Sequence, residues 1–278
     1  MAPVLASPMA LVAAALVVVL SATAAAAASQ SCGCAAEQCC NRSGYCGAGE
    51  DYCGAGCQSG PCDAPAAAGG NNVSVACVVT PDFFGALTAQ AADGCEGKGF
   101  YTRDAFLAAA GYYPAFGRTG TVDDSKREIA AFFAHANLET IKFCYINEIN
   151  GSNKNYCDPT STQWPCQAGK GYYGRGPLQI SWNYNYGPAG QSIGFDGVGD
   201  PDAVARSGVV AFRAALWYWM GAVHEAIVSG HGFGATIRAI NGALACDGKN
   251  PVGVGRRVGY YEQFCRQLGV DPGANLTC

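Results

Sequence analysis

Half of the cysteines in this chain lie in one short segment. Eight of the sixteen fall between Cys32 and Cys62, in the order C-x-C-x4-CC-x5-C-x6-C-x3-C-x4-C. So short a segment cannot bury a sufficient apolar core, and cross-links must replace it. A zinc cluster would favour Cys-x2-Cys pairs or nearby histidines, and the segment has neither. The spacing therefore predicts a small disulfide-bonded module.

An apolar stretch near the N-terminus predicts that the chain is secreted, which would place its cysteines in an oxidising compartment. Residues 11–20 are apolar throughout, and the alanines at 26–28 are typical of a cleavage site, although the preceding residues lack Lys and Arg. A membrane anchor is the alternative, but the apolar core is shorter than the roughly 20 residues that span a bilayer. We expect residues 1–28 to be a cleaved signal peptide and the protein to be secreted, without a membrane contact afterwards.

Composition narrows the class of ligand. The formal charge is −4 and no run of Lys or Arg occurs, which argues against nucleic acid as a partner. Only 14% of the residues are charged, whereas glycines (38) and tyrosines (14) are abundant. This balance favours a neutral, polar, ring-shaped ligand. The three histidines show no metal-site spacing, and we expect neither a metal nor another cofactor.

Beyond the module, the chain divides into a linker and one larger domain. Residues 64–76 are rich in Ala, Gly and Asn, as in flexible linkers. Helical patterns dominate after them, no run of alternating strand appears, and the other eight cysteines are widely spread. We therefore predict a module over 29–63, a linker over 64–76 and a mainly α domain over 77–278, long enough for one sizeable core.

Two tyrosines in the module are candidate sugar-binding residues. Aromatic faces bury the apolar face of a pyranose, so Tyr45 and Tyr52 suit this role; alternatively, they fill the small core. The cysteine order resembles the hevein-type chitin-binding domain, in the shortened form of class IV plant chitinases. The resemblance implies sugar binding by Asn41, Ser43, Tyr45 and Tyr52, although the family usually has a large aromatic residue at the position of Ser43. It also implies the disulfides Cys32–Cys40, Cys34–Cys46, Cys39–Cys53 and Cys57–Cys62.

A helical pattern over residues 123–139 ends on a glutamate. Either Asp123 or Asp124 can cap its start, and one face is formed by Ile129, Phe132, Phe133 and Ala136. Glu139 continues this face at the C-terminal end, where desolvation and the helix dipole both disfavour a charged carboxylate. A carboxyl group in that setting can act as a general acid.

A second glutamate, Glu148, follows nine residues later in the polar, turn-rich segment 144–151. It would stay ionised there and could act as a general base. Many helical proteins contain two such glutamates, so the pair alone indicates little.

Residues 172–188 strengthen the interpretation, because they combine amide, hydroxyl and aromatic side chains with glycines (YYGRGPLQISWNYNYGP). A packed core does not need this composition, but a saccharide groove does. The segment resembles the signature of family 19 glycoside hydrolases, the plant-type chitinases. Other segments also resemble this family and occur in the same order as in the family, namely residues 99–106, 163–166, 240–244 and 257–261. Together with the signature, the resemblance covers nearly all of residues 77–278.

The resemblance implies a mainly α, lysozyme-like, two-lobed domain and an inverting endochitinase acting on β-1,4-linked N-acetylglucosamine polymers. Glu139 would be the acid, Glu148 the base about 6.5–9.5 Å away, and Ser181 would hold the nucleophilic water. The cleft would also contain Tyr156, Trp164, Gln179, Tyr184, Asn185, Asn241 and Arg257. The implied disulfides are Cys95–Cys144, Cys157–Cys166 and Cys246–Cys278, which leaves Cys77 and Cys265 unassigned.

Two positions depart from the family pattern. The family usually has His immediately before the acid and a third Glu after the Asn-Gly motif, where this chain has Leu138 and Ala245. The third Glu normally pairs with the arginine found here as Arg257, so we expect Arg257 to contact Glu139 and favour its charged form. The alternative function is therefore a chitin- or glycan-binding, lectin-like protein with weakened or lost catalysis.

The same resemblance carries expectations about biology. We expect a monomer that acts on chitin and N-acetylglucosamine oligomers, in defence against fungi or in cell-wall turnover. Because no extension follows Cys278, the cell wall or apoplast is expected rather than the vacuole.

Overall fold

The computed structural model describes residues 34–35, 38–40, 45–53 and 71–278. In the first three ranges, the two-residue strands β1 (Cys39–Cys40) and β2 (Cys46–Gly47) pair antiparallel, and the single turn α1 (Glu50–Cys53) follows. The disulfides Cys34–Cys46 and Cys39–Cys53 join these elements. Both are pairs that the hevein-type resemblance implies.

The two tyrosines of the module differ in exposure. Tyr45 is 63% exposed. The ring of Tyr52 lies against Gly47, where an added Cβ would stand 2.6 Å from the ring carbons. The other residues of the expected sugar site and disulfide framework lie outside the described residues; they are Cys32, Asn41, Ser43, Cys57 and Cys62. The expected signal peptide and residues 54–70 also lie outside them.

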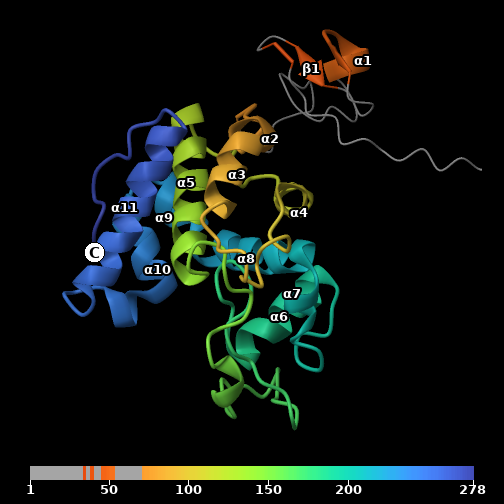
Figure 1. Ribbon diagram of the computed structural model, residues 1–278, viewed down its shortest axis with the longest axis vertical. Helices are drawn as coiled ribbons and strands as arrows, with labels where there is room; N and C mark the ends of the chain where they lie inside the picture. The colour runs from red at the N-terminus through yellow and green to blue at the C-terminus, as the bar shows by residue number, and fades with distance from the viewer. Residues whose placement is uncertain (1–33, 36–37, 41–44, 54–70) are drawn as a thin grey trace, which may run out of the picture. The chain divides into compact units, whose positions relative to one another are not determined.

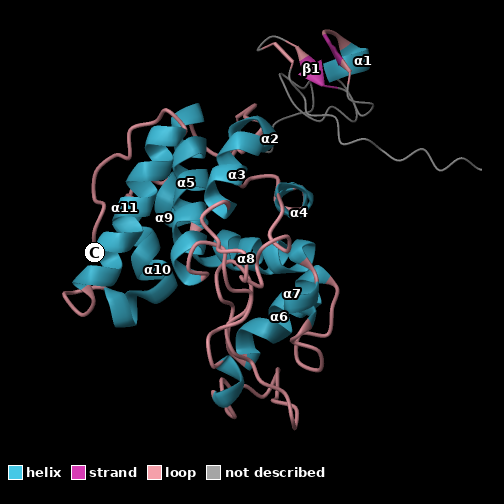
Figure 2. Cartoon of the chain, viewed as in Figure 1, coloured by secondary structure: helices cyan, strands magenta, loops and turns pink. Residues whose placement is uncertain are grey.

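Residues 71–278 form a helical body, as the sequence predicts (Figures 1 and 2). Its longer helices are α3 (Pro81–Thr88), α4 (Arg103–Ala110), α5 (Val122–Glu139), α6 (Asn183–Ile193), α8 (Gly208–Ala222), α10 (Phe233–Ala245) and α11 (Pro251–Gln267). Shorter helical turns are α2 (Val75–Val78), η1 (Gly151–Asn153), α7 (Ala203–Arg206) and α9 (His224–Val228). Among the described residues, no helix is both long and apolar enough to cross a membrane.

Helix α5 forms the centre of the larger hydrophobic cluster. It packs against α9 and α11, and its residues from Glu128 to Asn137 are all buried. The apolar face predicted for this helix is therefore real, but burial extends around the whole helix. Aromatic rings from α3, α4 and α8 surround it, with Phe106 and Phe133 4.9 Å apart and Phe132 and Trp219 5.5 Å apart.

The start of α5 differs from the expectation. Thr121 is the N-cap, and its hydroxyl accepts a hydrogen bond from the Asp124 amide at 3.1 Å. The Asp124 carboxylate in turn accepts the Thr121 amide at 2.9 Å. This reciprocal capping box satisfies two backbone donors at once, whereas a cap at Asp123 or Asp124 would satisfy one.

A second, smaller cluster lies beside the first and includes parts of α6, α7 and α8. Helix α8 belongs to both clusters. Phe212, Leu216 and Trp219 pack into the larger one, whereas Ala211 and Ala214 pack into the smaller one. The two clusters are the cores of the two lobes that the family resemblance implies.

Three disulfides stabilise this body, at Cys95–Cys144, Cys157–Cys166 and Cys246–Cys278. Each is a pair that the family 19 resemblance implies. The two unassigned cysteines are free thiols, Cys77 at the surface and Cys265 in the core. Burial raises the pKa of the Cys265 thiol to about 11, so this cysteine remains a neutral core residue.

The end of the predicted linker packs onto the helical body. The Asn71 side chain donates to the Gly120 carbonyl at 2.9 Å and to the Ser125 hydroxyl at 2.8 Å. Val75 is buried in the larger cluster. The Asn-rich composition of this stretch therefore serves a specific hydrogen-bonded contact at the start of α5.

Candidate active site

A cleft of about 630 Å³ collects most of the residues predicted from the sequence. Its walls come from the C-terminus of α5, the loop that follows, the segment before α6, and helices α6, α8 and α10. The predicted residues that line it are Glu139, Glu148, Tyr156, Gln179, Ser181, Tyr184, Asn185 and Asn241. Segments more than 100 residues apart in the chain thus contribute to one site.

Glu139 is the last residue of α5 and projects a partly exposed carboxylate into the cleft, with 23% of the side chain exposed. Arg257 from α11 donates to Glu139 Oε1, so the expected contact between these two residues is present. Arg257 is only 4% exposed and lies behind the acid, outside the cleft lining. Among residues 71–278, Glu139 Oε2 accepts no hydrogen bond.

Glu148 has a different environment. Its Oε1 accepts hydrogen bonds from Lys154 Nζ and from the Tyr156 hydroxyl, the latter at 2.9 Å, and its Oε2 accepts the Gly174 amide at 3.1 Å. Burial acts to raise the pKa of Glu148, but the hydrogen bonds from Lys154, Gly174 and Tyr156 outweigh it and lower the pKa. Glu148 is therefore a carboxylate near neutral pH.

Backbone pairing fixes the position of Glu148. Its amide donates to the Gly174 carbonyl at 2.8 Å, and the Gly176 amide donates to the Ile146 carbonyl at 2.8 Å. A Cβ at position 174 would lie 2.9 Å from Gln179 Oε1 and 3.3 Å from Glu148 Cβ. Glycine is needed there because the backbone passes between two cleft side chains.

Ser181 lies in a strained turn that leads into α6. Gln179 and Trp182 have positive φ angles of 48° and 74°, which are unfavourable for residues with side chains and recur at functional sites. The Ser181 hydroxyl donates to the Gln179 carbonyl at 3.0 Å, and Asn185 Nδ2 donates to the Ser181 carbonyl at 2.9 Å. These contacts hold the hydroxyl and amide groups at the wall of the cleft.

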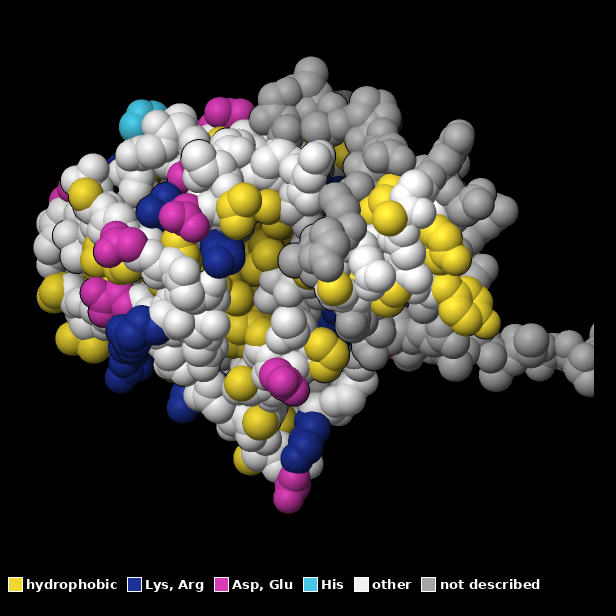
Figure 3. Space-filling model, turned by 90° about the horizontal axis from the view of Figure 1, so that it is seen from above, with side chains coloured by type: hydrophobic (Ala, Val, Ile, Leu, Met, Phe, Trp, Pro, Cys, Tyr) yellow, Lys and Arg dark blue, Asp and Glu magenta, His cyan; other side chains and the backbone are white. Residues whose placement is uncertain are grey.

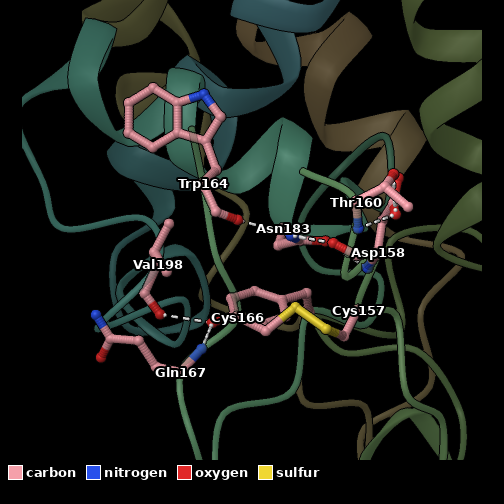
Figure 4. Close-up of a disulfide and its surroundings, with 9 residues drawn as sticks. Cys157, Asp158, Thr160, Trp164, Cys166, Gln167, Asn183 and Val198 are labelled. Carbon is pink, nitrogen blue, oxygen red and sulfur yellow. Dashed lines mark hydrogen bonds between the residues drawn. A yellow bond between two sulfur atoms is a disulfide. The ribbon is translucent and has the colours of Figure 1, made fainter. Parts of the chain in front are cut away.

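The loop that follows Tyr156, residues 157–166, is bonded to Asn183 at the start of α6 (Figure 4). Asn183 Nδ2 donates to the carbonyls of Asp158 and Trp164 at 3.0 and 2.7 Å, and Asn183 Oδ1 accepts the Asp158 amide at 2.7 Å. The Cys157–Cys166 disulfide closes the same loop. One buried asparagine and one disulfide therefore position Tyr156 beside Glu148.

The position of Trp164 corrects the prediction that this residue lines the cleft. Its indole lies against Gly187 of α6, where an added Cβ would be 2.2 Å from the ring, and it lines a separate depression of about 350 Å³. Since Gly187 has no side chain, the indole packs onto the helix backbone. Trp164 therefore supports α6 from outside the cleft.

The cleft also contains two residues, Trp182 and Lys154, that the sequence interpretation did not assign to it. The ring of Trp182 stacks on that of the predicted Tyr184, with the ring centroids 5.7 Å apart and the planes 13° apart. Trp182 belongs to the 172–188 motif, so its aromatic character was a usable signal. Lys154 had no such signal, because its contact with Glu148 depends on how the intervening turn folds.

Charge does not gather into an area of one sign on the face shown in Figure 3, among the residues that the structure describes. Basic and acidic side chains lie interspersed there. In the same described residues, no group of three His, Cys, Asp or Glu side chains is arranged to hold a metal ion. The side chains that line the cleft offer carboxyl groups, amides, hydroxyls, the Lys154 ammonium and aromatic rings.

Comparisons with known proteins agree with one another. The family model for glycoside hydrolase family 19, described as class I chitinase, matches residues 78–231 and 224–278. Chitinase 6 of Oryza sativa subsp. japonica is 78% identical over 222 residues, which are 80% of this chain and 81% of that protein. Endochitinase B of Zea mays is 60% identical over 251 residues, covering 90% of this chain and 88% of that protein.

Solved structures give the same result at the level of the fold. The crystal structure of a family 19, class IV chitinase from Zea mays superimposes with a TM-score of 0.69 at 60% identity, covering 73% of this chain and 98% of that one. Chitinase C from Streptomyces griseus superimposes with a TM-score of 0.67 at 41% identity, covering 72% and 97%.

Proposed function

Because this chain belongs to glycoside hydrolase family 19, with its helical, lysozyme-like fold, we propose that it is an endochitinase that hydrolyses β-1,4-linked N-acetylglucosamine polymers with inversion. The observation that carries the proposal is a pair of glutamates that line one cleft and differ in their hydrogen-bonding environments. Glu148 is held as a carboxylate by three donors, whereas Glu139 ends a buried helix and has one unbonded oxygen among residues 71–278.

In the proposed reaction, Glu139 gives its proton to the glycosidic oxygen as the bond to the anomeric carbon breaks. Glu148 accepts a proton from a water molecule, whose oxygen attacks that carbon from the opposite face. Ser181, at the wall of the cleft, is the proposed contact of this water. The products are a reducing end of inverted configuration and a free 4-hydroxyl group, and solvent returns each glutamate to its starting state.

The lining of the cleft supports a neutral sugar polymer as the substrate. The stacked rings of Trp182 and Tyr184 offer an apolar surface for pyranose faces. Amide side chains at Gln179, Asn185 and Asn241 offer donors and acceptors for hydroxyl and acetamido groups. The disulfide-bonded module is the proposed second chitin contact, and its cysteines support secretion. A role in defence or in cell-wall turnover is part of the same proposal.

The test is the release of reducing ends from soluble chitin oligomers, with the anomer of the first product followed by proton NMR. We expect hydrolysis that yields the α-anomer first. The alternative, a chitin-binding protein without catalysis, predicts binding of the oligomers without release of reducing ends. A β-anomer as the first product would contradict inversion but not hydrolysis.

Ala245→Glu tests how the missing third carboxylate affects the acid. Arg257 contacts Glu139 in the structure, and the residue at position 245 is an alanine that cannot share the charge of the guanidinium. A carboxylate at position 245 should share the positive charge of the guanidinium, while His135 and Glu139 keep Arg257 in place. We expect a higher rate of reducing-end release from chitin oligomers, because the positive charge beside the acid is then partly neutralised.

The matched control for that substitution is Ala245→Gln, which has nearly the same size and no charge. Because Ala245 is buried, both variants are compared at temperatures well below their unfolding midpoints. If glutamine had the same effect as glutamate, or if neither changed the rate, a negative charge at this position would not act on the Arg257–Glu139 pair.

Lys154→Met tests the electrostatic setting of the base. Lys154 lowers the pKa of Glu148 through a hydrogen bond and its charge, so removing the ammonium should raise the pKa of Glu148. Since the base must be deprotonated, we expect the acid limb of kcat/KM to move to higher pH. Lys98→Met, which removes an exposed lysine paired with Asp93 outside the cleft, should leave the profile unchanged. An unmoved acid limb in the Lys154 variant would assign that limb to another group.

A further inference from the structure

A buried chain of hydrogen bonds lies directly behind Glu139. Arg257 donates through Nη2 to Glu139 and through Nη1 to His135 Nδ1 at 2.7 Å. His135 Nε2 lies 2.8 Å from Thr236 Oγ1, and the Thr236 hydroxyl donates to the Phe233 carbonyl at 2.6 Å. The side chains of His135 and Thr236 are fully buried, so the chain links α5, α10 and α11 away from solvent.

Donor and acceptor chemistry allows one arrangement of protons in this chain. A guanidinium group only donates, so His135 Nδ1 must accept and therefore carries no proton. The neutral ring then carries its proton on Nε2, which donates to Thr236 Oγ1. The Thr236 hydroxyl proton is directed to the Phe233 carbonyl. The polar side-chain atoms of His135 and Thr236 then all have partners, and the orientation of Arg257 is fixed from the side facing away from the cleft.

The surroundings of His135 favour this neutral state. Burial first, and then the charge of Arg257, hold the pKa of His135 well below its usual range. The rings of Trp219 and Phe233 lie 6.0 and 5.0 Å from the imidazole and bring no charge. Of the charged groups, Arg257 contacts the ring directly, and Glu139 reaches it only through that guanidinium.

We propose that His135 and Thr236 are positioning residues for the reaction proposed above, on which this inference rests. They hold the Arg257 guanidinium in the orientation that braces Glu139 Oε1 and leaves Oε2 for the substrate. His135 supplies an acceptor for Arg257 without a second negative charge. The position of the acid at the end of α5 is thus set by α10 and α11 as well as by α5 itself.

Two substitutions test the proposal through kinetics. His135→Leu removes the acceptor, and we expect kcat to fall about 10²-fold with little change in KM, because a small displacement of a reacting group has that effect. Thr236→Val keeps the shape but removes the acceptor for Nε2–H, and kcat should fall about fivefold. His135→Gln, whose amide offers both an acceptor and a donor, should recover most of the activity lost in the leucine variant.

A matched control distinguishes a positioning role of His135 from a purely structural one. His224 is a second buried histidine, bonded to Glu128 at 2.6 Å in a network away from the cleft. His224→Gln should lower the melting temperature and leave kcat nearly unchanged. If His135→Leu lost no more activity than His224→Gln at an equal loss of melting temperature, or if His135→Gln recovered nothing, the positioning role would be wrong.

A measurement on the wild-type protein keeps this inference separate from the proposed function. Nitrogen-15 NMR of the histidine rings should show His135 with an unprotonated Nδ1, a protonated Nε2 and no titration between about pH 5 and pH 8. A titrating ring or the opposite tautomer would overturn the inference even in an active enzyme. An inactive wild-type protein with the expected spectrum would instead contradict the proposed function.

Discussion

Replacing Glu139 with glutamine should reduce chitin-oligomer hydrolysis by about 10²–10⁴-fold, the typical contribution of a general acid. Glutamine keeps the size of the side chain and can still meet Arg257, but its amide cannot give a proton to the glycosidic oxygen. Initial rates of reducing-end release measure the loss. Binding to chitin beads should remain, because the proposed binding module is a separate part of the chain.

The control for this variant is Glu225→Gln, which neutralises an exposed glutamate at the start of α9, outside the cleft. It should keep wild-type activity. A Glu139→Gln variant within about tenfold of the wild-type rate would be incompatible with the acid role.

Glu148→Ala should cause a loss of similar size, about 10²–10⁴-fold, because no group would remain to take the proton from the attacking water. The same change also opens space beside the anomeric carbon. A small anionic nucleophile such as azide needs no base, so it should restore cleavage and give the α-glycosyl azide, the product of attack from the opposite face.

The azide experiment distinguishes the two glutamates. Azide cannot protonate a sugar leaving group, so Glu139→Ala should remain inactive on chitin oligomers when azide is added. Rescue of both variants, or of neither, would contradict the assignment of base to Glu148 and acid to Glu139. A β-glycosyl azide from the Glu148 variant would indicate that attack occurs from the other face.

The sequence predicts those parts of the fold and site that depend on local pattern or on motif order. The apolar spacing in residues 123–139 identified α5 and placed Glu139 at its end, because helical periodicity is a property of neighbouring residues. The 172–188 motif likewise brought Gln179, Ser181 and Asn185 to one wall. The mainly α, two-lobed fold followed from the family resemblance, and the comparisons confirm it.

Contacts between distant segments could not be predicted in the same way. The hydrogen bonds of His135 reach residues 101 and 122 positions away, and no local pattern marks them. Trp164 was expected in the cleft from the family resemblance, yet the absence of a side chain at Gly187 gave its indole a packing site on α6. Such outcomes depend on which surfaces meet after folding, whereas the approach of Lys154 to Glu148 depends on how the short turn between them folds.

Helix α8 has a consequence for how the enzyme loses its structure. Because Phe212 and Leu216 complete one hydrophobic cluster while Ala211 and Ala214 complete the other, neither lobe keeps a whole core without this helix. Partial unfolding of one lobe therefore exposes apolar surface of its neighbour, and residues 71–278 should denature in a single cooperative transition. The substrate groove persists for as long as the whole body is folded, and it cannot survive as a fragment.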